Sequence, residues 1–508
     1  MMKRNRLVAL ACMLAASWML CDLAPAAADD RPNIVLIMCD DMGFSDIGCY
    51  GGEIHTPNID RLAADGMRFK QFYNCAKCTT TRASLITGLH PRQGRGGLLR
   101  DSMVTIAEVL RPAGYQTSLS GKWHLGRSET HPFRRGFDEY YGLLDGCCNF
   151  FDPVQPDPSY KGGKVRTFGH NDKLITEFPD DYYTTDAFSD HAVTTIRRFA
   201  AADKPFFVHV CYTAPHYPLH AKPEDIAKYR GKYMMGWDKL RQQRHQRQIE
   251  LGLIDPEWTL PGRDDDTSSW EDEKNKEYED SRMAVYAAMI DSMDQGIGRI
   301  LAALKETGTA ENTLVLFLAD NGGCAENPGG TNTSRVVGPK EYYVACGRPW
   351  AYAQNTPFRR YKAWVHEGGV STPLIARWPK VIKSGTFTSQ VGHIIDFMPT
   401  CAELAAAEYP TEHNGHEIIP VEGKSLVPIF RDETREGHDV LYWEWAGTRA
   451  IRQGDWKLVY DRQYRRWELY DLKADRTETN DLSAEHPEQV KEMIAKWEAW
   501  AEKTGARK

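Results

Sequence analysis

The stretch Asn33-Ile-Val-Leu-Ile-Met-Cys-Asp-Asp, residues 33 to 41, is an unbroken apolar run that ends in two carboxylates. A continuous apolar run of this length is typical of a strand buried on both faces, as in a parallel sheet covered by helices. Asp40 and Asp41 would then stand at the carboxyl end of that strand. Open α/β sheets carry their functional sites at such strand ends. The stretch therefore predicts both a fold class and the place of a site.

The following segments alternate between helix and strand patterns. Thr56 and Pro57 fit the start of a helix that Gly66 ends, and Thr105 with Glu108 has the pattern of a capping box for a second helix. Further strands are predicted at 67–73, 115–120, 206–212 and 313–319, and a long helix at about 278–305. This β-α-β order predicts an α/β fold, with a mostly parallel sheet sandwiched by helices.

The last part of the chain has a different pattern. Short aromatic runs at 441–445, 456–460 and 467–471 predict antiparallel strands, and a closing helix is predicted at 487–503. A single core rarely grows beyond roughly 250 to 300 residues. We therefore expect a catalytic domain over 29–435 and a smaller C-terminal antiparallel sheet plus helix over 436–508. Two charged stretches, 241–250 and 264–280, are predicted to form an excursion over the surface, because charge runs are usually solvated.

Residues 1–28 fit a secretory signal peptide. Three basic residues precede an apolar run at 7–21, and Ala26-Ala27-Ala28 fits a cleavage site. No later apolar run approaches the roughly 20 residues that span a bilayer, so we expect an exported protein, periplasmic or extracellular, without a membrane contact after cleavage. The net charge of -7 becomes -9 when the signal leaves with three basic residues and one acid. This acidity argues against a nucleic acid partner.

A second stretch, Cys78-Thr-Thr-Thr-Arg-Ala-Ser-Leu-Ile-Thr-Gly88, carries the candidate chemistry. Alone it has ordinary explanations, because cysteine is often a small buried residue and Thr/Ser-rich runs are usually loops. Cys75 and Cys78 also form a Cys-x-x-Cys pair, which fits a redox couple or half of a zinc site, but no second pair follows at zinc-ribbon spacing. A phosphatase-type cysteine is disfavoured because Arg82 comes too early. Ten of the twelve cysteines remain after the signal, so modification of Cys78 would leave an odd number and at least one free or paired outside the chain.

Oxygen ligands follow two of the predicted strands. Asp40 and Asp41 follow the first, and Asp320-Asn321-Gly-Gly follows the strand at 313–319. Three carboxylates and an amide oxygen suit Ca²⁺ better than zinc. Each motif alone is also a common turn sequence. Their combination with the Cys78 stretch is what predicts a site.

The order of these motifs resembles the sulfatases of the bacterial arylsulfatase type, within the alkaline phosphatase superfamily. The resemblance spans nearly the whole mature chain and is carried by 33–41, Thr56-Pro-Asn-Ile-Asp-Arg-Leu62, the Cys78 stretch, Gly121-Lys-Trp-His-Leu-Gly126, Pro215-His216, Ala319-Asp-Asn-Gly322 and 355–369. It implies an α/β core with a smaller antiparallel C-terminal domain, one Ca²⁺, and hydrolysis of sulfate esters to an alcohol and inorganic sulfate.

The resemblance also implies a role for each matching residue. Cys78 would be converted to formylglycine, whose hydrated form offers one oxygen to attack sulfur and a second to expel sulfate. The Ca²⁺ ligands would be Asp40, Asp41, Asp320, Asn321 and residue 78. Arg82 would hold the modified residue, Lys122 and Lys362 would stabilise negative charge in the transition state, His124 would assist the diol, and His216 would protonate the leaving oxygen.

The expected partners are a formylglycine-generating maturase and a sulfated carbohydrate or small sulfate ester. The family usually has proline or alanine two residues after the cysteine, where this chain has Thr80. This departure predicts a more tolerant maturase, or incomplete modification in a foreign host. Arg359 and His366 are further candidate substrate contacts.

Two other functions compete with sulfate-ester hydrolysis. One is a phosphodiesterase or phosphonate monoester hydrolase of the same superfamily, and the other is a catalytically inactive glycan-binding relative. Two-zinc phosphatases of the superfamily differ more, because they need further histidine ligands and commonly have Asp-His where this chain has Asp320-Asn321.

Overall fold

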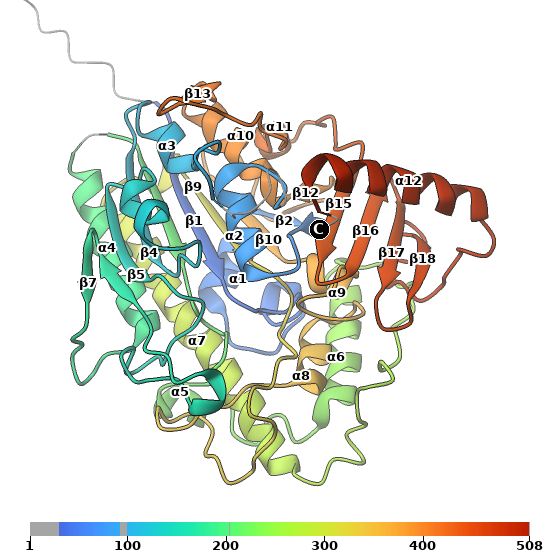
Figure 1. Cartoon of the computed structure of the whole chain (residues 1–508). Helices are drawn as coiled ribbons and strands as arrows, with labels where there is room; N and C mark the ends of the chain where they lie inside the picture. The colour runs from blue at the N-terminus through green and yellow to red at the C-terminus, as the bar shows by residue number, and fades with distance from the viewer. Residues whose placement is uncertain (1–29, 92–98, 203, 507–508) are drawn as a thin grey trace, which may run out of the picture. The chain divides into compact units, whose positions relative to one another are not determined.

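The computed structural model describes residues 30–91, 99–202 and 204–506 (Figure 1). The predicted signal peptide lies outside these residues. Within them, no helix is long and apolar enough to cross a membrane.

A ten-stranded mixed sheet organises residues 31–506 as far as they are described (Figure 1). Its five middle strands are parallel, and the flanking strands add antiparallel pairs on both sides. In sheet order the strands are β11 (Thr386–Thr388), β2 (Met67–Phe69), β10 (Leu374–Arg377), β9 (Thr313–Ala319), β1 (Asn33–Cys39), β8 (Phe206–Cys211), β4 (Gln116–Gly121), β5 (Glu139–Leu143), β6 (Phe168–His170) and β7 (Lys173–Ile175). The predicted α/β fold is confirmed.

The apolar stretch at 33–39 forms the central strand β1, between β9 and β8. Successive side chains of a strand point to opposite faces. Val35 and Ile37 belong to one hydrophobic core and Leu36 and Met38 to the other, all without solvent exposure. Burial of each such side chain contributes about 1.5–3 kcal/mol. The unbroken apolar run thus reflects a strand that is covered on both sides.

Helices cover both faces of the sheet. The core that contains Val35 also includes side chains of α1 (Pro57–Ala64), α4 (Thr184–Ala200), α6 (Gly236–Glu250), α7 (Lys276–Glu306) and α8 (Arg348–Gln354). The core that contains Leu36 includes side chains of α2 (Cys78–Thr87), α3 (Ile106–Leu110), α10 (Phe397–Leu404) and α11 (Val427–Phe430). The predicted capping box of α3 is present, with Thr105 and Glu108 each bonded to the other's backbone N–H.

Two local predictions differ from the structure. The strand predicted at 67–73 is two strands in different sheets, because β2 pairs with β10 and β11 whereas β3 (Phe72–Tyr73) pairs with β12 (Gly392–His393). The charged run 241–250 is part of helix α6 and not a loop excursion; one face of it is exposed, as expected for a charge run, whereas Arg241, Arg244 and Gln248 are buried. Arg244 is buried there because Asp46 at 2.7 Å and Glu53 at 2.8 Å neutralise it.

The C-terminal part forms a separate four-stranded antiparallel sheet with one helix, drawn in red in Figure 1. Its strands are β15 (Leu441–Trp445), β16 (Thr448–Gln453), β17 (Trp456–Asp461) and β18 (Arg466–Asp471). Helix α12 (Pro487–Thr504) packs on one face through Met493 and Trp497, and Val365 and Val370 pack on the other. The small antiparallel sheet was predicted, except that β16 has no aromatic run and was missed. The domain boundary after residue 435 stays a prediction.

A buried ion network links this small sheet to the main part of the chain. The carboxylate of Glu367, in the short helix α9 (Glu367–Val370), accepts from Lys457 Nζ at 2.8 Å and from Arg476 Nε at 2.9 Å. The hydroxyl of Tyr73 donates to the same carboxylate at 2.9 Å. Both oxygens of this buried acid are therefore paired.

Candidate active site

Parallel pairing brings the predicted acidic motifs together. Cys39 at the end of β1 lies in register with Ala319 at the end of β9, so Asp40 and Asp320 begin neighbouring turns. The Asp320 backbone N–H donates to the Cys39 carbonyl at 3.1 Å. Both carboxylates have no solvent exposure. The carboxyl edge of the sheet thus holds the buried acids that the sequence predicted for it.

Asp41 adopts an unusual backbone conformation that turns its side chain towards the same point. Its φ is 64°, in the left-handed region, which costs a residue other than glycine about 1–3 kcal/mol. The Asp41 backbone N–H donates to Asp320 Oδ1 at 3.2 Å, and Asn321 Nδ2 donates to Asp41 Oδ1 at 2.7 Å. These bonds hold the three acids and the amide in one cluster, the strand-end cluster.

Two oxygens of the strand-end cluster are buried without a hydrogen-bond donor among the described residues, namely Asp40 Oδ1 and Asn321 Oδ1. A buried unsatisfied acceptor costs about 1–3 kcal/mol. Asp40, Cys78 and Asp320 each place one possible ligand atom within 4.8 Å of the others. Burial, and after it the nearby Asp40, raise the pKa of Asp320 to about 7, although Arg82 and Lys122 act in the opposite direction. An oxygen-rich set of this kind fits a hard divalent cation such as Ca²⁺.

Cys78 is the first residue of α2, and its side chain is 2% exposed. Its Sγ lies 3.6 Å from His124 Nδ1. Burial raises the pKa of the Cys78 thiol, although Lys122 and Lys362 act in the opposite direction. The unmodified side chain is therefore a protonated thiol, and a thiol is a much weaker nucleophile than a thiolate.

Arg82 lies one helical turn after Cys78 and points into the protein. Its guanidinium donates to Asp320 Oδ2 and to the Lys122 carbonyl, both at 2.9 Å, and the side chain is 3% exposed. Arg82 thus connects the helix of Cys78 with the ends of β9 and β4. Arg82 is therefore not an ordinary arginine on a helix surface.

Two buried lysines face the acids. Lys122 follows β4 and donates to Asp40 Oδ2, and Lys362 donates to Asp41 Oδ2 at 2.7 Å. Burial acts to lower the pKa of each amine, but the facing carboxylate outweighs it and the pKa is raised for both. Two fixed positive charges therefore stand beside the strand-end cluster.

Two histidines complete the group. His216 Nδ1 donates to the Tyr217 carbonyl at 2.6 Å, and Nε2 lies 3.3 Å from Asp41 Oδ2. Burial lowers the pKa of His216 to about 3, with Asp41 opposing this and Lys362 adding to it, so the ring is neutral at physiological pH. Burial and Lys122 also lower the pKa of His124.

The position of His124 depends on its own backbone and on a glycine. Its φ of 59° is left-handed, and a Cβ on Gly146 would lie 2.5 Å from Cε1 of the His124 ring. A Cβ atom does not approach another carbon atom this closely in proteins, so only glycine fits beside the ring at this position. Gly146 was not predicted, because nothing in its local sequence marks it.

All ten predicted site residues thus lie in one connected cluster, whereas two weaker candidates do not join it. His366 Nε2 is 3.3 Å from Glu468 Oε2, and Arg359 donates to Tyr470 and to the Glu478 carbonyl. These two side chains contact the C-terminal sheet and not the cluster, and their contact with substrate stays a prediction. Lys77, Tyr217 and Glu326 lie beside the cluster, and the sequence analysis missed all three. The only sequence feature that could have indicated Lys77 and Tyr217 is that each is next to a predicted site residue.

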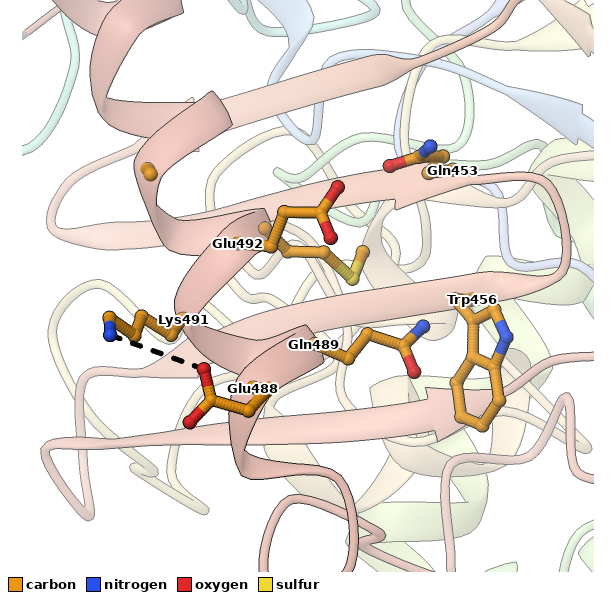
Figure 2. A pocket seen from close by; sticks show the side chains of 8 residues that line it. Gln453, Trp456, Glu488, Gln489, Lys491 and Glu492 are labelled. Carbon is orange, nitrogen blue, oxygen red and sulfur yellow. Dashed lines mark ion pairs between the residues drawn. The ribbon is translucent and has the colours of Figure 1, made fainter.

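A cavity of about 680 Å³ on the C-terminal part is separate from this cluster. Figure 2 shows its lining, with Gln453 and Trp456 facing Gln489 and with Lys491 paired to Glu488 on α12. Its lining residues come from β16, β17 and α12, which contribute no side chain to the strand-end cluster. This cavity is therefore distinct from the candidate active site.

A family model described as Sulfatase matches residues 32–407. The chain belongs to the sulfatase family. A second model, described as N-sulphoglucosamine sulphohydrolase, C-terminal, matches residues 359–503. The sulfatase resembles an uncharacterized sulfatase of Schizosaccharomyces pombe at 33% identity, over 94% of this chain and 95% of the relative. It also resembles the arylsulfatase of Klebsiella aerogenes at 32% identity, over 82% of this chain and 95% of the relative.

Solved structures agree with this assignment. The crystal structure of Ps i-CgsB matches this sulfatase with a TM-score of 0.69 and 30% identity, over 93% of each chain. The complex of Ps i-CgsB with k-i-k-neocarrahexaose matches with the same TM-score and 28% identity. The family and these relatives make the protein a sulfuric ester hydrolase.

Proposed function

We propose that this sulfatase hydrolyses sulfate esters of carbohydrates with a formylglycine made from Cys78 and one Ca²⁺ held by Asp40, Asp41, Asp320, Asn321 and residue 78. The observation that carries the proposal is the pair of buried, unpartnered oxygens Asp40 Oδ1 and Asn321 Oδ1 beside the Cys78 helix terminus. The cation would supply charge neutralisation at the sulfuryl oxygens, and the hydrated aldehyde would supply the attacking oxygen and a second hydroxyl for sulfate release.

The chain's own residues would bind and orient the ester. The Nζ groups of Lys122 and Lys362 are fixed by Asp40 and Asp41 in a water-poor site, where fixed cations act more strongly than in water. Arg82 would hold residue 78 in place, since its bonds to Asp320 and Lys122 already fix the guanidinium beside the helix. The first amides of α2 add positive potential at residue 78.

Proton movement would involve the two histidines. We assign the leaving oxygen to His216 Nε2, because Nδ1 donates its own proton to the Tyr217 carbonyl. Nε2 would take up a proton from solvent before passing it to the leaving oxygen. Burial is the main cause of the lowered pKa of His216, and Lys362 and Lys122 add to it. A bound sulfate ester is negative and would oppose the two lysines, which would favour the protonated ring that this step needs. His124, next to Sγ of Cys78, would exchange a proton with residue 78 during sulfate release.

Carbohydrate is the substrate class that the relatives support. Among them are Ps i-CgsB, solved with an oligosaccharide, and an N-acetylgalactosamine-6-sulfatase of Canis lupus familiaris, 28% identical over 88% of this chain and 75% of the relative. Export through the predicted signal peptide and modification by a formylglycine-generating maturase belong to the same proposal.

The test compares nitrophenyl sulfate with a nitrophenyl phosphate diester, at equal enzyme and with Ca²⁺ present. We expect a clear preference in kcat/KM for the sulfate and loss of both activities in Cys78→Ala. A preference for the diester would assign the site to phosphodiester hydrolysis instead. No turnover of either ester by protein that carries formylglycine would favour a glycan-binding role.

A further inference from the structure

A carboxylate at the edge of the site connects two segments of the candidate machinery. Lys77 Nζ donates to Glu326 Oε1 at 2.6 Å, and the Tyr217 hydroxyl donates to Glu326 Oε2. Lys77 directly precedes Cys78, and Tyr217 directly follows His216. Glu326 therefore spans the gap between the residue assigned to attack on sulfur and the residue assigned to the leaving oxygen.

Glu326 is also one of the places where residues at the buried cluster reach solvent. The side chains of Cys78 and His216 are 2% and 5% exposed, whereas the side chain of Glu326 is 41% exposed and that of Lys77 is 20% exposed. The leaving alcohol must extend from the buried sulfate towards solvent. An alcohol group that leaves the cluster on the side of Lys77 would pass Glu326.

The Glu326 carboxylate keeps capacity to accept more hydrogen bonds. An ionised carboxylate offers about four lone-pair sites, and the bonds from Lys77 and Tyr217 use one on each oxygen. Burial acts to raise the pKa of Glu326, but Lys362 and Lys77 outweigh it and lower the pKa to about 2. The Glu326 carboxylate therefore only accepts hydrogen bonds, and a hydroxyl group is one donor that it can bind.

An ordinary ion pair is the alternative explanation. Exposed Lys/Glu pairs contribute about 0–1 kcal/mol and usually have no other role. The Tyr217 hydroxyl argues against this, because a side chain only 6% exposed fixes the second oxygen of Glu326. The carboxylate is thereby held in one orientation on both sides, as a recognition group needs to be.

We propose that Glu326 accepts a hydrogen bond from a sugar hydroxyl near the sulfate-bearing carbon, and so selects hydroxylated leaving groups over aromatic ones. This inference rests on the proposed sulfate-ester hydrolysis and adds a specificity residue to it. A hydrogen bond to a charged partner contributes enough to change kcat/KM by about 10- to 100-fold.

The test measures kcat/KM for wild type, Glu326→Ala and Glu326→Gln on a panel of monosulfated monosaccharides and on nitrophenyl sulfate, whose leaving group has no hydroxyl. Glu326→Ala is expected to lose about 10- to 100-fold on the sugar sulfate that wild type prefers and less than about 3-fold on nitrophenyl sulfate. Glu326→Gln keeps an acceptor oxygen, so its kcat/KM on the sugar sulfate should lie between the values for wild type and Glu326→Ala. Formylglycine content is measured in every variant, so that a change in modification is not mistaken for a change in recognition.

Glu306→Ala is the matched control, because Glu306 forms a comparable surface pair with Arg197 at 2.7 Å and lies at the end of α7. It should stay within about 2-fold of wild type on both substrate classes. Equal losses of Glu326→Ala on both classes would overturn the inference, and so would no loss on either. Wild type that turns over nitrophenyl sulfate but no sugar sulfate would overturn it as well. Formylglycine-bearing wild type without activity on any sulfate ester would refute the proposed function itself.

Discussion

Two buried clusters of charge in this sulfatase have similar composition but differ in how their oxygens are satisfied. At the junction with the C-terminal sheet, both oxygens of Glu367 accept hydrogen bonds, from Lys457 on one side and from Tyr73 and Arg476 on the other. In the strand-end cluster, Asp40 Oδ1 and Asn321 Oδ1 have no donor among the described residues. A fold tolerates buried charge that is fully paired, whereas neighbouring buried oxygens without donors indicate a place for a ligand.

The largest effect should follow from removing the residue that the open cluster surrounds. Cys78→Ala eliminates the attacking group, so kcat on nitrophenyl sulfate should fall by at least about 10³-fold. The free energy of unfolding should change by no more than about 1 kcal/mol, since little volume is lost. Kinetic assays and denaturant titration measure the two quantities. Cys401→Ala, at a buried thiol in α10, is the control and should keep nearly full activity.

The second prediction concerns the open oxygens. Wild type should be stabilised by Ca²⁺, by about 2.7 kcal/mol at a concentration one hundred times Kd. Asn321→Ala removes one of the two unpartnered oxygens, so the rise in Tm with Ca²⁺ should shrink and kcat should fall by about 10²-fold or more. Thermal unfolding with and without chelator measures the shift. An unchanged Ca²⁺ response in Asn321→Ala would show that the ion binds elsewhere.

The third prediction concerns the buried ion network around Glu367. Lys457→Met leaves Glu367 buried without its main partner and should cost about 3–5 kcal/mol of unfolding free energy. Because Lys457 bonds to Glu367 and Glu478 and to no residue of the strand-end cluster, kcat of the folded variant should stay within about 3-fold of wild type. Denaturant unfolding at neutral pH measures the first effect. A cost below about 1 kcal/mol would mean that the junction does not depend on this pair.

The fourth prediction is the pH dependence of the same network. Lys457 and Arg476 outweigh burial and lower the pKa of Glu367 from 4.5 to about 2. A carboxylate with a lowered pKa contributes stability above its unfolded pKa and loses it as the pH falls through the folded value. One pKa unit corresponds to about 1.4 kcal/mol, so roughly 3 kcal/mol should disappear between about pH 4.5 and pH 2. Glu367→Gln should lack this part of the acid sensitivity, and an identical pH profile in both proteins would contradict the assignment.

The smallest effect is expected where charge is exposed. Asp65 lies 3.5 Å from Arg61 of α1, and the two side chains are 46% and 80% exposed, respectively. Asp65→Asn should change the free energy of unfolding by less than about 0.5 kcal/mol, because water screens the pair. A larger change in denaturant titration would show that burial is not what separates structural charge from incidental charge in this protein.

Local sequence patterns identified much of the fold and the strand-end cluster. The run at 33–41 predicted a central strand with two acids at its end, because periodicity and strand-end chemistry are both readable within nine residues. The charged run at 241–250 was misplaced, because its sequence does not reveal that Arg244 pairs with Asp46 and Glu53, nearly two hundred residues earlier in the chain. Pairing across such separations depends on tertiary structure.

The same limit explains the missed residues. Lys77, Tyr217 and Glu326 meet from three distant segments, and none of them stands in a distinctive motif of its own. Gly146 matters only because the His124 ring approaches it in the folded chain. The motifs therefore revealed the residues assigned to the reaction itself, while these neighbouring residues required the structure.

The proposed mechanism depends most directly on the chemical state of residue 78. Mass spectrometry of the tryptic peptide from Cys78 to Arg82, taken from a preparation that hydrolyses sulfate esters, tests it in one measurement. We predict an aldehyde at residue 78, in a fraction of the protein that rises in proportion to specific activity. A fully active preparation that contains only the unmodified thiol would contradict the account.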